Sequence, residues 1–103
     1  MIEEVLAAAT IPGWPSRCPD PPDGTYAIYF DTVSADGPDN ANRIFTHDAI
    51  IELYEPKQDA VAEYSLEGAL DNRGLHWTKQ SRYWLQNIQR YQVIYEFTYM
   101  TKN

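Results

Sequence analysis

The chain has 103 residues, enough for one domain that buries about two-thirds of its surface without disulfides or metals. Its hydrophobic content of 44% excludes a disordered chain. Its net charge of −7 argues against binding to a nucleic-acid backbone or an anionic membrane.

A short amphipathic helix is predicted at residues 2–9, where apolar residues recur at helical spacing. This segment is too short and too acidic for a signal peptide or a membrane span. The single cysteine, Cys18, cannot form an internal disulfide and fits a reducing compartment. We therefore expect a protein that is made in the cytoplasm and has no membrane partner.

A proline-rich connector follows at residues 11–24, and its five prolines and two glycines predict an extended surface segment without regular structure. Trp14 lies in this connector and has two interpretations. In the first it pins the connector onto the core, which is the common role of a large aromatic side chain. In the second it is an anchor for a partner.

Two strands are predicted next, at residues 25–33 and 43–55, with a turn-rich loop at 34–42 between them. The first strand carries bulky residues on both faces and is expected to be covered on both sides. One face of the second strand is apolar except for His47, which we expect to be a hydrogen-bonded structural histidine. The loop carries Asp36 and Asp39 but lacks the spacing of a calcium site.

A second helix is predicted from residue 60 to residue 73, with Asp59 as its N-cap and Gly74 as its stop. Gly68 inside this helix costs about 1 kcal/mol relative to alanine. A close approach of the helix to the sheet would explain that glycine. Residues 75–86 surround a further turn, and residues 87–89 form a turn or bulge before the last strand.

The last strand, residues 90–99, has the clearest pattern in the chain. Tyr91, Val93, Tyr95, Phe97 and Tyr99 alternate with mainly polar residues, which predicts a half-buried strand with an aromatic face. Such a face needs a sheet around it and a helix over it. The chain is therefore predicted to be a single α+β domain, residues 1–103, with its sheet and helix core at 25–100. We expect a mostly antiparallel four-stranded sheet packed by two helices, in the order α-β-β-α-β-β.

Chemistry-bearing motifs are absent from the sequence. Cys18, His47 and His76 have no metal-ligand spacing, and no phosphate loop or nucleophile elbow is present. The acidic residues are expected on solvated faces. We therefore predict no enzyme activity, no catalytic residues, no metal and no cofactor. A sheet of four strands leaves two edges unpaired in a monomer, and this favours an assembly role.

The order of these segments resembles that of small phage tail-completion or tail-terminator proteins, a family that includes minor capsid or neck proteins. The resemblance rests on the short N-terminal helix and on residues 11–15, 26–29, 35–42, 45–55, 69–70 and 91–97, and it covers nearly the whole chain. It implies a structural subunit of a phage or prophage virion that forms a ring, commonly a hexamer, and completes the tail tube at the head–tail junction. The implied partners are the tail-tube protein and head–tail connector proteins.

No catalytic residues belong to that family, so the candidate assembly contacts come from this chain's own pattern. They are Trp14, Asp36, Asp39, Asn42 and Arg43, together with the strand edges. The negative net charge of the chain suits a channel through which DNA slides without specific binding. Two alternatives remain: a head-completion or neck role, and a small cytoplasmic binding module with an aromatic cleft near Trp77, Trp84 and Tyr95.

Overall fold

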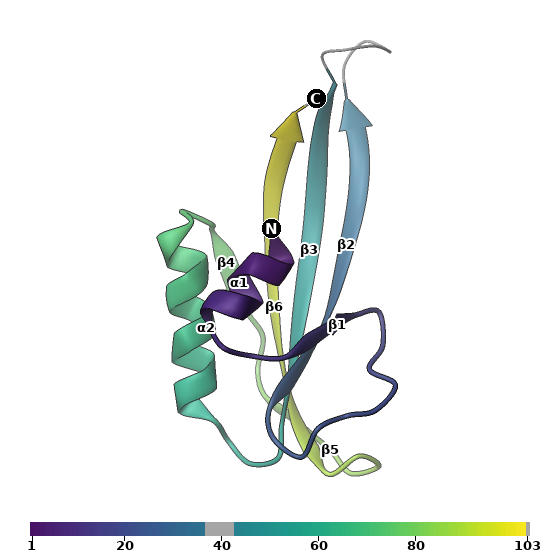
Figure 1. Ribbon diagram of the computed structural model, residues 1–103, viewed down its shortest axis with the longest axis vertical. Helices are drawn as coiled ribbons and strands as arrows, with labels where there is room; N and C mark the ends of the chain where they lie inside the picture. The colour runs from purple at the N-terminus through teal and green to yellow at the C-terminus, as the bar shows by residue number, and fades with distance from the viewer. Residues whose placement is uncertain (37–42, 103) are drawn as a thin grey trace.

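The computed structural model describes residues 1–36 and 43–102 of the chain (Figure 1). These residues form two helices, α1 (Ile2–Ala8) and α2 (Ala60–Asn72), and six strands. The strands are β1 (Gly13–Pro15), β2 (Tyr26–Asp36), β3 (Ile44–Glu55), β4 (Trp77–Lys79), β5 (Tyr83–Leu85) and β6 (Arg90–Lys102). Neither described helix is long and apolar enough to cross a membrane.

The strands form one mixed sheet in the order β1-β2-β3-β6-β4, with β5 also paired to β6. All pairs are antiparallel except β1 with β2, which is parallel. The α+β class and the two helices are confirmed, whereas the expected four-stranded antiparallel sheet is wrong in detail. β2 also continues to Asp36, into the segment predicted as a loop, because backbone pairing with β3 extends to Ile44.

The proline-rich connector contains β1, which we did not predict. Prolines argue against a strand because they lack a backbone N–H. Here β1 is an edge strand, so Pro15 needs no outer donor. The residues that flank β1 also bond to β2. Ala27 donates its N–H to the Pro12 carbonyl at 2.9 Å, and Ser16 donates its N–H to the Tyr29 carbonyl at 3.0 Å.

The aromatic face of β6 is covered as predicted. Val93, Tyr95 and Phe97 are buried together with the alternating residues of β3 that pair with them. One apolar core joins this face to both helices; its helical members are Ile2, Val5, Leu6, Leu66, Ala69 and Leu70. Both described helices pack on this one face of the sheet (Figure 1). We call the opposite face the open face. Among the β2 side chains described on that face only Tyr26, at the start of the strand, is buried, so the expectation of cover along the whole strand is wrong.

β4 and β5 form one interrupted strand along the edge of β6. Gln80 donates its N–H to the Ile94 carbonyl, and Tyr83 pairs with Gln92. Ser81 and Arg82 therefore both lie opposite Val93, and this two-against-one count defines a β-bulge. The bulge directs Arg82 toward α2, where it meets Glu63.

Helix α2 begins as predicted, since Asp59 accepts a hydrogen bond from the Ala62 N–H at 3.1 Å. Gly74 follows with a φ of 69°, a conformation that favours glycine. The explanation offered for Gly68 is wrong, because a Cβ at this position would meet nothing within 4 Å. The helix does not approach its neighbours closely there.

We expect the Gly68→Ala variant to be more stable by about 1 kcal/mol, because alanine restricts the unfolded chain and has open space in the folded one. The midpoint temperature of thermal unfolding should rise by roughly 4–8 °C for a domain of this size. Gly74→Ala is the matched control and should lower the midpoint, since its φ is positive. A lower midpoint for Gly68→Ala would contradict the assignment of open space.

Candidate assembly surface

The three central strands project well beyond both helices (Figure 1). We call this projection the arm; it comprises residues 32–36 of β2, 44–48 of β3 and 98–102 of β6, which lie side by side in register. The molecule measures 47 × 27 × 22 Å, and its radius of gyration is 14.9 Å. A compact domain of 100 residues has a radius near 13 Å. The arm therefore makes the fold elongated.

A polar cluster ties the three strands together at the base of the arm. His47 lies between Asp31, with Nδ1 3.1 Å from both carboxylate oxygens, and Thr101, with Nε2 2.8 Å from the hydroxyl. Tyr99 stacks on the His47 ring at 4.3 Å and donates its hydroxyl to Asp31. The prediction that His47 is a hydrogen-bonded structural residue is confirmed. Burial and this bond to the carboxylate raise the pKa of Tyr99 to about 12.

Both outer edges of the arm lack a strand partner within residues 1–36 and 43–102. β1 pairs with β2 only as far as Tyr29, and β4 pairs with β6 only as far as Phe97. Large apolar side chains are exposed near these edges: Val33 is 49% exposed and Met100 is 68% exposed. Proteins usually protect an exposed edge with charged residues, prolines or bulges. On its two edge strands the arm carries no proline, and its charged residues there are Asp36 and Lys102, both at the tip.

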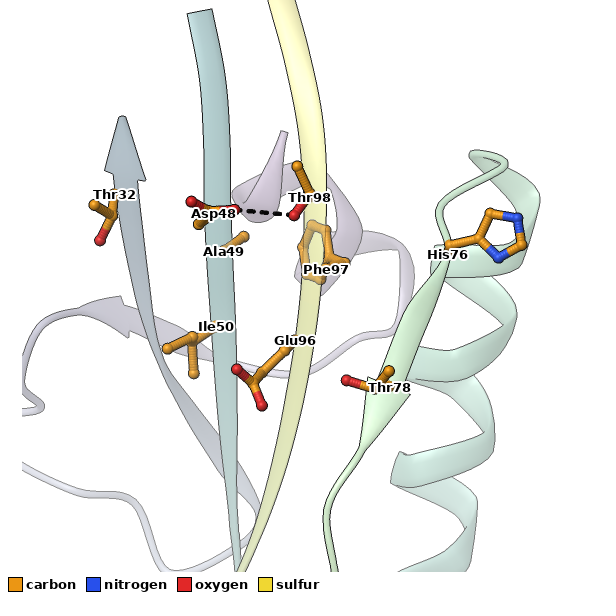
Figure 2. A pocket seen from close by; sticks show the side chains of 9 residues that line it. All are labelled: Thr32, Asp48, Ala49, Ile50, His76, Thr78, Glu96, Phe97 and Thr98. Carbon is orange, nitrogen blue, oxygen red and sulfur yellow. Dashed lines mark hydrogen bonds between the residues drawn. The ribbon is translucent and has the colours of Figure 1, made fainter. Parts of the chain in front are cut away.

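A groove of about 490 Å³ lies on the open face, beside the base of the arm (Figure 2). Asp48 and Ile50 of β3, Glu96 of β6 and Thr78 of β4 line it, and His76 stands at its margin. Each carboxylate already accepts a hydrogen bond: Asp48 from the Thr98 hydroxyl, and Glu96 from the Gln80 side-chain amide. The groove is therefore an acidic surface whose two carboxylates are fixed in position by hydrogen bonds from neighbouring side chains.

A buried ionic cluster fastens α2 to the edge of the sheet. The side chains of Glu55 and Glu63 are 0% and 4% exposed. The Arg82 guanidinium donates to Glu63 and has its Nε 3.6 Å from Glu55 Oε1. Lys79 Nζ lies 2.8 Å from Glu63 and 2.7 Å from Glu67. The expectation that acidic residues lie on solvated faces is therefore wrong for Glu55 and Glu63.

The two buried carboxylates have opposite pKa shifts. Burial raises the pKa of Glu55 to about 7, and the neighbouring Glu63 carboxylate adds to the rise. The pKa of Glu63 is lowered, because hydrogen bonds from Lys79 and Arg82 outweigh its own burial. Glu55 Oε2 has no hydrogen-bond partner among the described residues. Below about pH 7 these shifts favour the proton on Glu55 and the charge on Glu63, which faces Arg82 and Lys79.

The predicted assembly contacts do not form one site. Trp14 lies on β1, half-buried, with its ring edge-on to Tyr26 at 6.4 Å, which agrees with the pinning role. Asp36 ends β2 at the tip of the arm, and the half-buried Arg43 precedes β3 there. Trp14 pairs with Ile28, eight residues before Asp36, so the two positions are roughly 26 Å apart along the strand. Asp39 and Asn42 lie outside the described residues.

The aromatic residues of the proposed cleft do not line a common cavity. Tyr95 is fully buried and donates its hydroxyl to Glu67, and burial raises its pKa. Trp77 packs edge-on against Tyr95 and donates its indole N–H to Asp71 at 2.8 Å. Trp84 packs instead against Tyr91. These contacts are those of core and rim side chains rather than of a ligand-binding surface.

Unpaired strand edges were expected, but the sequence did not indicate which segments form them. It also gave no prediction of the ionic cluster of Glu55, Glu63 and Arg82. The alternation of β3 offered a signal for one of them, because Glu55 continues the buried series of Ile51 and Leu53. The arm edges carried no signal of their own. Their exposure depends on where the short strands β1 and β4 end.

Comparison with known proteins supports the fold but assigns no family. No family model matches the chain, and no curated protein shows significant sequence similarity to it. Among solved structures, a chain of the "Virion of native gene transfer agent (GTA) particle" shares the fold with a TM-score of 0.60. The two chains are 13% identical, and the match covers 96% of this chain and 84% of the virion chain.

Proposed function

We propose that this protein is a structural, non-catalytic subunit of a phage or prophage-derived particle. The observation that carries the proposal is the fold shared over 96% of the chain with a component of a gene transfer agent virion. The projecting arm adds a physical reason, since its two unpaired edges suit contacts with neighbouring subunits. The proposed location is the virion.

Within that class, we propose that the chain completes the tail tube and forms a ring, with six copies by the family resemblance, at the head–tail junction. The resemblance in segment order supports this role, and the net charge of −7 suits a lumen that does not retain DNA. The partners would be the tail-tube protein on one side and a connector protein on the other. A head-completion or neck role is the alternative within the same class.

The test is the mass of the protein in solution, measured by light scattering after size exclusion, alone and with the cognate tail-tube protein. We expect either a ring alone or a large complex when tubes are added. Binding to the head-side connector but not to tubes would favour the head-completion role. A monomer that ignores both partners would contradict the proposed function.

A further inference from the structure

β2 and β6 both run antiparallel to the central strand β3, so they point in the same direction. Their outer edges lie on opposite sides of the arm (Figure 1). Each copy therefore presents two different edges that face away from each other. An interface that joins unlike surfaces of identical chains is heterologous and forms a ring when the rotation closes.

The outward backbone groups of β2 belong to its odd-numbered residues. Ala27 donates outward to Pro12, and Tyr29 accepts from Ser16, both in the direction of β1. Alternate residues of a strand direct their N–H and C=O to the same side. Beyond β1, the same orientation therefore applies to Asp31, Val33 and Ala35. The side chain of Asp31 is bonded to His47, on the core face of the sheet.

The outward groups of β6 belong to its even-numbered residues, because the Ile94 carbonyl accepts from Gln80 beside β4. Beyond β4 these residues are Thr98, Met100 and Lys102. Among the described residues, the β6 edge of the arm thus offers three residues with unpaired outward backbone groups, and the β2 edge offers two, Val33 and Ala35, with Asp31 just before them. Leaving such groups unpaired at the centre of an interface would be costly.

We infer that the arm edge of β6 in one copy pairs in parallel with the arm edge of β2 in the next copy. This inference rests on the proposed ring and names the surface that builds it. A second copy fits better than an unrelated partner, because one heterologous contact satisfies both edges of every subunit. Pairing of two β2 edges would satisfy only one edge and would stop at a dimer.

Cysteine cross-linking tests this pairing. Ser34 and Met100 lie at the same level of the sheet, since both pair with Thr46, and both face the open side. In a Cys18→Ser background, the Ser34→Cys/Met100→Cys variant should form covalent multimers under mild oxidation, with tail tubes present if the free protein is monomeric. The Thr32→Cys/Met100→Cys variant tests a register shifted by two residues. The distance limits of a disulfide make each result specific for register.

The matched control is Val33→Cys/Met100→Cys, whose side chains lie on opposite faces of the sheet and should not cross-link. Each single variant should stay uncross-linked alone, whereas a mixture of Ser34→Cys with Met100→Cys should give covalent dimers. Dimers from Ser34→Cys alone would overturn the inference in favour of paired β2 edges. Rings of the expected mass without cross-links in either double variant would also overturn it and leave the proposed function standing. A monomer even with tubes and connector would overturn both.

Discussion

The Arg82→Met variant is expected to lose about 3 kcal/mol of unfolding free energy at pH 8, because it leaves Glu55 buried without a cation and Glu63 paired with Lys79 alone. The corresponding fall in the unfolding midpoint is roughly 12–24 °C. Chemical denaturation followed by fluorescence measures the change directly, since the chain contains three tryptophans.

The loss should be smaller at pH 5. The folded-state pKa of Glu55 is raised, so the stability linked to its neutral form is fully present below the ordinary value of 4.5 and is lost as pH rises through about 7. At pH 5 Glu55 is neutral in the folded protein and needs no cation, while Glu63 remains charged. An equal loss at both pH values would contradict the assignment of the proton to Glu55.

Two further variants separate charge from packing. Arg73→Met removes an exposed arginine, whose described contact is with the Met1 sulfur at 3.8 Å, and should change stability by less than about 0.5 kcal/mol. Adding Glu55→Gln to Arg82→Met removes the titrating group and should flatten the pH dependence of the loss. A double variant that keeps the full pH dependence would assign it to another residue.

The Trp77→Ala variant is expected to be less stable by about 3 kcal/mol, because it removes packing against Tyr95 and the hydrogen bond to Asp71. Denaturant titration of the purified variant measures this loss. The result bears on function, since a core role for Trp77 excludes it from the aromatic cleft of a binding module.

Trp84→Ala is the control for this experiment. Its side chain is 43% exposed and packs mainly on Tyr91, so the expected loss is about 1 kcal/mol. Retained stability in Trp77→Ala would contradict the packing assignment. In that case, loss of binding to a small aromatic or apolar ligand would revive the binding-module alternative.

The local sequence pattern predicted the elements in which buried residues recur at the spacing of a strand or a helix, and the residues that cap a helix. The alternation of Val93, Tyr95 and Phe97 placed β6 under a helix, and Asp59 and Gly74 marked the ends of α2. These features depend on side chains within a few residues of each other. The sequence alone carries such information directly.

Features set by distant pairing could not be predicted in this way. β1 is a strand because an edge position tolerates Pro15, and that edge exists only once β2 is in place. The bulge at Ser81 and Arg82 appears only in the register against Val93. For the same reason, the assembly surface was expected at single residues such as Trp14 and Arg43, whereas the exposed feature is a pair of strand edges.

The position of β6 has a consequence for biosynthesis. It follows every other strand that the structure describes, yet it lies between β3 and the interrupted β4–β5 strand. A chain emerging from the ribosome therefore lacks both the aromatic side of its core and the second edge of the arm until β6 has been made. Parallel and long-range pairings also form slowly. A subunit truncated before β6 would lack the edge proposed to pair with its neighbour, so only chains that include β6 could be incorporated into a growing ring.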